Sequence, residues 1–382
     1  MLRSRAATSA PGKLRISQAR SRTACAGLLA AFALVAVAAP ISLPGQQIDA
    51  DSVTVSGISS GGYMAVQMHV AHSALVKGVG VIAAGPYGCA QTASGLYANQ
   101  LRAQGPCMQG AYSLWQRTLC LSGWAWASCP GANRVDVASS VQATQRRAAS
   151  GEIDPVAGLR SHRVMLISGS SDATLVPAVV DALRQYYLEF VAPANVHHEK
   201  LSGADHTFPT DSYRDGNPCS VASSPYISDC RFDAAKAILN HLYPGLRPRN
   251  DGALTGALIE FDQTAFISAT QASGMAPSGW IYVPESCAAV RCRLHVAFHG
   301  CKQSTSSPIK RKFVEHAGYN RWADSNALIV LYPQAFASSS LPLNPNGCWD
   351  WWGYTDASNW DTQRGPQIQA VKAMIDRLGM AR

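Results

Sequence analysis

The sequence predicts an α/β fold in which a mostly parallel central sheet is flanked by helices. Three observations predict it. Short β-branched runs typical of buried parallel strands recur along the chain. Several of these runs lead directly into loops with polar side chains, the usual place of functional groups in open α/β sheets. Hydrophobic residues make up 47% of the chain, enough for one large core.

The sequence predicts six strands and three helices along the chain. We expect strands at 52–55, 76–85, 163–169, 196–201, 294–298 and 327–333, and helices at 63–70, 233–242 and 366–378. The interval of about 89–158 has little periodicity and contains four cysteines and three tryptophans. It is interpreted as a cap-like, disulfide-bearing insertion over the sheet. We expect residues 39–382, insertion included, to form one domain, because no linker, repeat or low-complexity block divides them.

The pentapeptide Gly57-Ile58-Ser59-Ser60-Gly61 lies between the first predicted strand and the first predicted helix. A nucleophilic serine on such a sharp turn needs glycines at both flanks, where a Cβ atom would collide with neighbouring backbone. This spacing selects Ser59, because a nucleophile at Ser60 would have branched Ile58 two residues before it. The alternative is a glycine- and serine-rich turn that happens to precede a helix.

An acid and a base follow later strands in a suggestive order. The strand at 163–169 leads into Asp172, and the strand at 196–201 leads into His206. Serine, aspartate and histidine in this chain order are typical of α/β-hydrolases. Asp172 could instead cap a helix near Ala173. Asp205 competes as the acid, but adjacent residues on an extended loop usually point apart.

The amide that completes an oxyanion hole is expected from the far end of the chain. No suitable loop precedes Ser59, whereas the strand at 294–298 runs into His299-Gly300-Cys301. The simplest interpretation is a circular permutation, in which the C-terminal third supplies the usual first half of the sheet. The backbone N–H groups of Ser60 and Cys301 would then bind the oxyanion.

Residues 1–38 are typical of a signal peptide. They carry six basic and no acidic residues, with an apolar stretch at 26–39 and the small-residue triplet 36–38. A membrane anchor is the alternative, but the stretch is short for a bilayer span. We therefore expect a secreted protein, extracellular or periplasmic, without stable membrane insertion after processing. The formal net charge of +8 falls to about +2 without the leader, which argues against nucleic-acid binding.

The cysteines predict disulfides rather than a metal site. One of the eleven lies in the leader, and the other ten are an even number in an exported chain. Cys219 with Cys230 and Cys287 with Cys292 are plausible local pairs, and Cys348 could bridge to Cys301. No ligand spacing typical of zinc is present. We expect no metal and no cofactor.

Five motifs together carry a family resemblance. They are GISSGGYM at 57–64, the Ser-Asp-Ala-Thr around Asp172, GADHTFP at 203–209, FHGC at 298–301 and NGCWDWWGY at 346–354. The chain resembles short-chain-length poly(3-hydroxybutyrate) depolymerases across essentially all of residues 39–382. The resemblance implies a single-domain, circularly permuted α/β-hydrolase. It also implies a serine esterase that cleaves the polyester or its oligomers to soluble 3-hydroxybutyrate products through an acyl-enzyme.

The resemblance also extends to individual residues. It implies a catalytic triad of Ser59, Asp172 and His206, with the Cys301 amide as an oxyanion donor. One tryptophan among Trp349, Trp351 and Trp352 is expected near the monomer subsite, although a core or capping cluster is an equally weighted interpretation.

The chain departs from many extracellular members of the family, because it has no linker and no separate polymer-binding domain. A feruloyl or acetylxylan esterase of the same superfamily is the alternative enzyme. A catalytically silent secreted binding protein is the alternative of another class, disfavoured because all three triad residues are intact. The expected partner is the polymer or oligomer substrate, and the expected state is a monomer.

Overall fold

The computed structural model describes residues 41–92, 95–121, 134–268 and 272–380, with no description of the side chains of 119–121. The predicted leader at 1–38 lies outside these ranges. So do Trp124, Trp126 and Cys129, and the side chain of Cys120. The described residues all belong to one compact unit, Pro40–Arg382.

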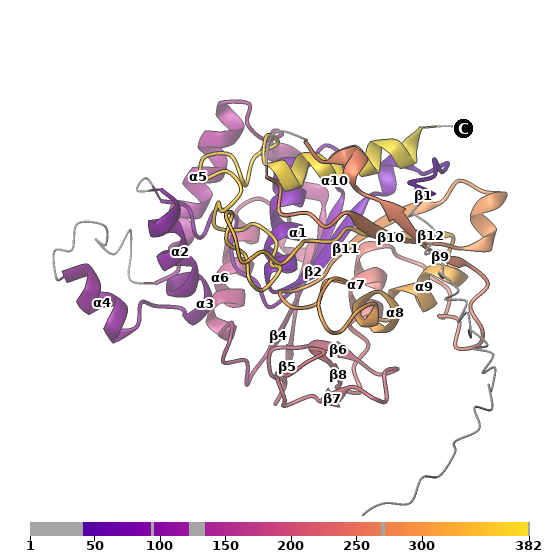
Figure 1. Ribbon diagram of the computed structural model, residues 1–382, viewed down its shortest axis with the longest axis horizontal. Coiled ribbons are helices and arrows are strands. Elements are labelled where there is room, and N and C mark those ends of the chain that lie inside the picture. The colour runs from indigo at the N-terminus through magenta and orange to yellow at the C-terminus, as the bar shows by residue number, and fades with distance from the viewer. Residues whose placement is uncertain (1–40, 93–94, 122–133, 269–271, 381–382) are drawn as a thin grey trace, which may run out of the picture. The chain divides into compact units, whose positions relative to one another are not determined.

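A nine-stranded, mostly parallel sheet forms the centre of this unit (Figure 1), as predicted. Its strands, in spatial order, are β1 (Ile41–Ser42), β9 (Ala257–Asp262), β10 (Ser278–Val283), β12 (Leu328–Tyr332), β11 (Arg293–Phe298), β2 (Thr54–Ile58), β3 (Gly78–Ile82), β4 (Arg163–Gly169) and β5 (Val196–Leu201). Only β10 runs antiparallel to its two neighbours. Every residue of β2, β3 and β12 is buried, as expected for parallel strands covered on both faces.

The predicted permutation is visible in the strand order. β2, near the start of the described chain, pairs in parallel with β3 on one side and with β11 on the other. β11 and β12 come from the C-terminal third, so two distant parts of the chain complete one sheet (Figure 1). The carboxyl ends of β2 and β11 therefore lie side by side.

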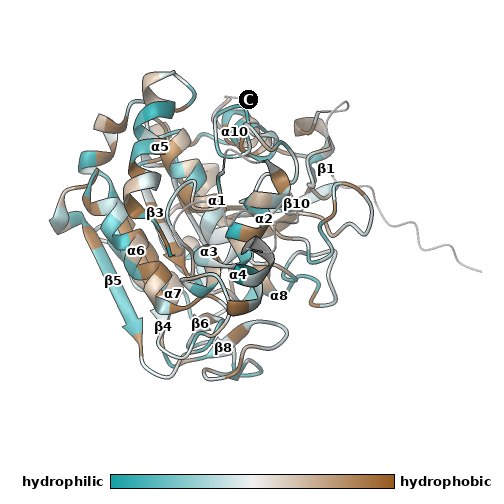
Figure 2. Ribbon diagram, turned by 90° about the vertical axis from the view of Figure 1, so that its left-hand side faces the viewer, coloured by the Kyte–Doolittle hydropathy of each residue, from teal (hydrophilic) through white to brown (hydrophobic). Residues whose placement is uncertain are grey.

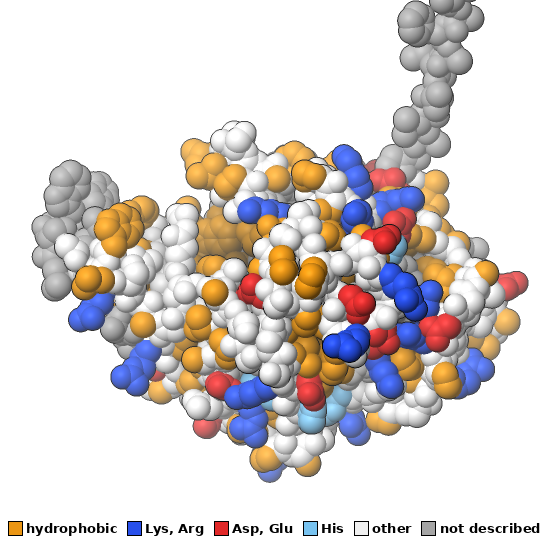
Figure 3. Space-filling view, turned by 90° about the horizontal axis from the view of Figure 1, so that it is seen from below, with side chains coloured by type: hydrophobic (Ala, Val, Ile, Leu, Met, Phe, Trp, Pro, Cys, Tyr) orange, Lys and Arg blue, Asp and Glu red, His pale blue; other side chains and the backbone are white. Residues whose placement is uncertain are grey.

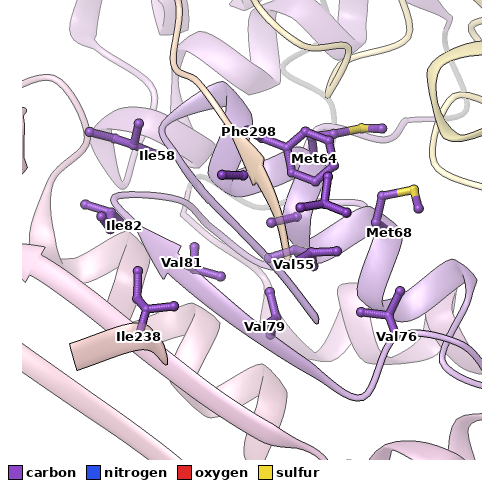
Figure 4. Packing of buried hydrophobic residues seen from close by; sticks show 14 of the residues in the cluster. Val55, Ile58, Met64, Met68, Val76, Val79, Val81, Ile82, Ile238 and Phe298 are labelled. Atoms are coloured by element: carbon purple, nitrogen blue, oxygen red, sulfur yellow. The ribbon is translucent and has the colours of Figure 1, made fainter. Parts of the chain in front are cut away.

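Helices cover both faces of the sheet. They are α1 (Ser60–Ala71), α5 (Val137–Ala149), α6 (Pro177–Leu188), α7 (Ala234–Leu242), α8 (Lys312–His316), α9 (Tyr319–Ser325) and α10 (Pro366–Gly379). Met64 and Met68 of α1 pack on one side of β2 and β3, and Ile238 of α7 packs on the other side (Figure 4). Ile238 lies directly against Gly80, where a Cβ atom would collide with it. All of α1 is buried, so this helix holds its first turn rigidly at the end of β2.

The strand β5 lies at the edge of the sheet and, unlike the central strands, is mostly polar. In its sequence, Val-His-His-Glu-Lys-Leu, only Val196 is buried and the other residues are partly or fully exposed, and the strand is hydrophilic in Figure 2. Charged side chains on an edge strand discourage pairing with another chain. The sequence predicted this strand with the bounds that the structure gives.

The described part of the predicted insertion between β3 and β4 contains four α-helices. They are α2 (Leu96–Gln104), α3 (Pro106–Gln109), α4 (Leu114–Leu121) and α5. A disulfide between Cys89 and Cys107 ties α3 to the segment after β3. α5 packs on α6 through the Thr144 hydroxyl, which lies 2.8 Å from Tyr186 Oη.

Elements that the sequence did not predict include β9, β10 and a second sheet of three short strands. This sheet consists of β6 (Phe208–Thr210), β7 (Asn217–Pro218) and β8 (Ile227–Asp229). Strands of two or three residues are too short to show periodicity. The second sheet begins two residues after His206 and thereby bounds that loop.

The disulfide predictions are confirmed for the pairs proposed. Cys219 bonds Cys230, Cys287 bonds Cys292, and Cys301 bonds Cys348. The Cys89–Cys107 pair is additional. Within the described ranges, no helix is long and apolar enough to cross a membrane. On the face shown in Figure 3, basic and acidic side chains are interspersed.

Candidate active site

Ser59 sits on a strained turn between β2 and α1. Its φ of 57° and ψ of −124° are rare for a residue with a side chain. The backbone N–H of Ser59 donates to Ile82 O at 2.9 Å, which ties the turn to the end of β3. A Cβ atom at Gly57 would come within 3.0 Å of the Gly61 backbone, so glycine is required there. The turn thus has the conformation expected of a nucleophile elbow.

His206 and Asp172 form a buried pair. His206 Nδ1 lies 2.8 Å from Asp172 Oδ2, and the two residues are 8% and 4% exposed. The other carboxylate oxygen, Oδ1, accepts from the backbone N–H groups of Thr174 and Leu175. The capping interpretation was therefore incomplete, because one oxygen caps a turn while the other faces the imidazole. α6 begins only at Pro177, so this turn precedes the helix.

Asp205 does not compete for the imidazole. Its Oδ1 accepts from the backbone N–H of His206 at 2.7 Å, which directs the carboxylate to the main chain. The Asp205 N–H in turn donates to Cys219 O, and Cys219 is bonded to Cys230. The second sheet and its disulfide therefore hold the loop that carries His206.

The three predicted residues follow strands of one sheet. Ser59 follows β2, Asp172 follows β4 and His206 follows β5. Because β2, β3, β4 and β5 are parallel neighbours, their carboxyl ends meet at the same edge. Asp172 occupies Nδ1 of His206, which leaves Nε2 as the nitrogen available to a hydroxyl.

The turn after β11 touches the first turn of α1. A Cβ atom at Gly61 would come within 3.0 Å of the carbonyl groups of Phe298 and His299. Ser60 is the first residue of α1, so its N–H has no acceptor within the helix. This close approach brings Ser60 next to the segment that carries Cys301.

His299 fixes the orientation of that segment. Its Nε2 accepts from the backbone N–H of Ala335 at 3.1 Å, so the proton must sit on Nδ1. Nδ1–H then donates to Gly300 O at 2.7 Å. Because the peptide bond is planar and trans, anchoring this carbonyl also sets the direction of the Cys301 N–H. Burial lowers the pKa of His299 to about 4, which keeps the ring neutral.

Further contacts hold the same turn. Gly300 N donates to Gln303 Oε1 at 2.8 Å, and Lys302 N donates to Asn346 O at 2.7 Å. The disulfide from Cys301 to Cys348 ties the turn to the tryptophan-rich segment 346–354. The sequence identified the turn but missed the positioning role of His299, because its partner Ala335 is 36 residues away.

Comparison with known proteins finds two relatives that are both named as depolymerases. No family profile matches the chain. The chain is 44% identical over 365 residues to a poly(3-hydroxybutyrate) depolymerase of Delftia acidovorans, covering 94% of this chain and 66% of that protein. It is 39% identical over 353 residues to a polyhydroxybutyrate depolymerase of Talaromyces funiculosus, covering 89% of this chain and 93% of that protein. The chain belongs to the poly(3-hydroxybutyrate) depolymerase family.

Solved structures agree with this membership. One is a PHB depolymerase from Penicillium funiculosum, and another is a serine-to-alanine variant of a PHB depolymerase complexed with an R3HB trimer. Each aligns with a TM-score of 0.76 and 37% identity, covering 88% of this chain and 98% of the other. The resemblance inferred from the five motifs is confirmed at the level of the family and the fold.

The three candidate substrate-binding tryptophans occupy different environments in this depolymerase-family chain. Trp349 is 0% exposed and packs on Phe298 and His299, with ring centroids 5.0 Å and 5.4 Å apart. The Trp349 side chain is enclosed in the core, so its role at a cleft stays a prediction. Its contact with His299 holds the imidazole that orients the Cys301 turn.

Trp351 and Trp352 are less completely buried than Trp349. Trp351 is 6% exposed and stacks on Tyr63 of α1, with centroids 4.1 Å apart and planes 5° from parallel. Trp352 is partly exposed and packs against Trp351 and Tyr354. Asp350 Oδ1 accepts from the backbone N–H of Trp352 and its two successors, which fixes this turn. Trp352 is the most accessible of the three.

Across the described residues, no group of three or more histidine, cysteine, aspartate or glutamate side chains could hold a metal ion.

Proposed function

We propose that this chain is a serine esterase that hydrolyses poly(3-hydroxybutyrate) or its oligomers to soluble 3-hydroxybutyrate products. Family membership supports the reaction class, a carboxylic ester hydrolase. The related structure with a bound R3HB trimer supports the substrate class. The observation that carries the proposal is the buried His206–Asp172 pair at 2.8 Å, on the same sheet edge as the strained Ser59 turn.

The residues act in the roles of a triad. Ser59 Oγ attacks the ester carbonyl carbon while His206 Nε2 removes the hydroxyl proton. The imidazolium that forms is stabilised by Asp172 at Nδ1. The tetrahedral intermediate collapses to an acyl-enzyme, and His206 returns the proton to the leaving alcohol oxygen. Water, activated by the same nitrogen, then cleaves the acyl-enzyme and releases the carboxylic acid.

The oxyanion hole in this proposal is formed by the backbone N–H groups of Ser60 and Cys301. Each donor of this kind contributes about 3 kcal/mol to the transition state. Support comes from the close approach of Gly61 to the turn after β11 and from the His299 hydrogen bond to Gly300 O. Trp352 is the proposed aromatic residue of the substrate subsite. Trp351 packs against it edge-on and is itself stacked on Tyr63 of α1.

We further propose that the leader at 1–38 directs export and that residues 39–382 act as a single catalytic domain and a monomer, with about 89–158 as a cap-like insertion. The four disulfides among the described residues fit an oxidising compartment.

The test is product release from amorphous poly(3-hydroxybutyrate), run beside methyl ferulate and acetylated xylan, with Ser59→Ala as the blank. Soluble 3-hydroxybutyrate monomer or oligomers from the polymer alone are expected. Activity confined to the ferulate or acetyl esters would retain the triad and overturn the substrate. Polymer cleavage by Ser59→Ala would overturn the nucleophile.

A further inference from the structure

His295 bridges two hydroxyl groups on the strand that leads to Ser59. The residue lies in β11 and is completely buried. Its Nδ1 is 2.7 Å from Thr54 Oγ1, and its Nε2 is 2.7 Å from Ser56 Oγ. Thr54 and Ser56 are alternate residues of β2, so their side chains point to the same face of the sheet. One imidazole ring thus spans two positions of the neighbouring strand.

Two tyrosines extend this contact at both ends. Ser56 Oγ lies 2.6 Å from Tyr319 Oη, and Thr54 Oγ1 lies 2.6 Å from Tyr243 Oη. Tyr243 Oη is also 2.8 Å from the carbonyl oxygens of Ser52 and Leu294. The chain of polar groups therefore ends on backbone carbonyls of the segment before β2 and of β11.

The backbone carbonyls at one end of this series of hydrogen bonds determine which group donates in each of them. Because carbonyls only accept, the single Tyr243 hydroxyl proton is donated to them, and Thr54 must donate to Tyr243. Thr54 has no second proton, so Nδ1 of His295 must donate to it. Burial lowers the pKa of His295 to about 3, so the ring is neutral and Nε2 accepts.

The other end then follows. Nε2 accepts from the Ser56 hydroxyl, and Ser56 in turn accepts from Tyr319. Apart from the Tyr243 proton, which the two carbonyls share, each proton is donated to one acceptor. Only one tautomer of His295, protonated at Nδ1, is compatible with this arrangement.

The strands that His295 joins carry the two halves of the proposed catalytic centre. β2 ends next to Ser59 and β11 ends next to the His299–Cys301 turn. Ser56 and His295 are 239 residues apart in sequence, so no short connection sets the pairing of their strands. If β11 slipped by two residues against β2, the same side chains would still face the core. The His299–Cys301 turn would, however, move by about 6.6 Å along the strand direction relative to Ser59. Such a slip would also break the bridge from His295 to both hydroxyls.

We propose that His295 is a positioning residue, which sets the register of β11 on β2 and thereby holds the Cys301 amide at a fixed place relative to Ser59. The inference rests on the proposed oxyanion hole. A ring hydrogen-bonded to both Thr54 and Ser56 also resists the smaller shear motions that would misplace the donor, and a misplacement of about 1 Å can cost about 100-fold in rate.

The kinetic test compares kcat and KM on a soluble 3-hydroxybutyrate oligomer. For His295→Leu we expect a kcat about tenfold lower with KM within about twofold, because donor placement acts on the transition state. Tyr319→Phe removes the donor to Ser56 and should lower kcat about threefold. Tyr332→Phe is the matched control: Tyr332 is equally buried on β12, and its hydroxyl donates to Asn320 Oδ1 instead of to a side chain of β2.

The kinetic and stability results distinguish a positioning role of His295 from a purely structural one. Similar losses of thermal stability in Tyr319→Phe and Tyr332→Phe, with kcat lowered only in Tyr319→Phe, support positioning. Equal kcat values in these two variants would overturn it, and this comparison decides the matter even if His295→Leu does not fold. Nitrogen-15 NMR of the wild type should show His295 protonated at Nδ1, and a proton on Nε2 would contradict the chain. Retained turnover in Ser59→Ala would instead overturn the proposed nucleophile, and with it the oxyanion hole on which this inference rests.

Discussion

At the residue scale, the site depends on side chains whose protonation is decided by their partners. The Asp172 carboxylate is hydrogen-bonded to Nδ1 of His206, and the backbone N–H of Ala335 donates to Nε2 of His299. Ser59 keeps a backbone conformation that costs on the order of 1–3 kcal/mol. The Ile82 hydrogen bond and the buried α1 helix sustain that strain. The sequence could predict Ser59, Asp172 and His206, because each follows a predicted strand.

His299 offers a prediction at this scale. His299→Leu removes the donor to Gly300 O and frees the Gly300–Cys301 peptide to rotate. We expect kcat on a soluble ester to fall by about 10- to 100-fold, part of the loss seen when an oxyanion donor is removed, with KM little changed. Steady-state kinetics check this. A rise in KM alone would mean that His299 serves substrate binding instead, and His299→Gln, which retains a donor and an acceptor, should recover part of the rate.

At the element scale, backbone contacts between elements set the geometry of the site. The first turn of α1 lies against the end of β11 without room for a methyl group at Gly61. Glycine flanks could be predicted from the motif. The atoms that they approach, the carbonyls of Phe298 and His299, lie at the end of β11 and in the turn after it, more than two hundred residues later. A sequence pattern gives the requirement for a close approach but not the identity of the approaching atoms.

Gly61→Ala tests this contact. The added Cβ must displace the carbonyls of Phe298 and His299, since backbone on both sides leaves no flexible group to move. We expect a loss of about 1–3 kcal/mol in unfolding free energy, as for other overpacked sites, together with a lower kcat. Denaturant unfolding and ester kinetics measure both. Gly158→Ala is the control, because its Cβ would meet only Ser73 at ordinary contact distance; equal effects in the two variants would refute the account.

The Cys301–Cys348 disulfide gives a second prediction for elements. It joins the turn after β11 to the tryptophan segment across 47 residues. Replacing both cysteines with alanine should lower the unfolding free energy by about 2–4 kcal/mol. Because the bond holds the turn that carries the proposed amide donor, kcat should fall as well. The matched variant replaces Cys287 and Cys292, which close a local loop away from Ser59, and should leave kcat unchanged.

At the scale of the whole molecule, the parallel part of the sheet was predictable because most of its strands are apolar runs, the polar edge strand β5 being the exception. β9 and β10 escaped prediction: β9 mixes polar and apolar residues, and β10 contains Gly279, Trp280 and Tyr282 without strict alternation. The second sheet has strands too short for any periodic signal. The permutation was predictable from chemistry, because the missing oxyanion loop had to come from somewhere else in the chain. Burial of Trp349 was not, since the sequence does not say which face of the turn meets the core.

Buried neutral histidines predict how stability depends on pH. His69, His295 and His299 are fully buried, and burial lowers the pKa of each below the unfolded value of about 6.5. Between about pH 6.5 and pH 4 the unfolded chain therefore binds protons that the native chain does not. Unfolding free energy should fall as pH decreases through this range, by up to about 1.4 kcal/mol per pH unit for each histidine.

The slope can be assigned to one residue with His299→Gln, which cannot titrate. Its unfolding free energy at neutral pH is expected to be lower than that of the wild type. Between about pH 6 and pH 4.5, however, its decline per pH unit should be shallower by about 1.4 kcal/mol, because one proton no longer distinguishes the two states. Urea unfolding at several pH values measures this difference, in which the contributions of all other groups cancel. If the plots of unfolding free energy against pH were parallel for the two proteins, His299 would be protonated equally in the native and unfolded chains. This result would contradict the account in which a neutral His299 ring orients the Cys301 turn.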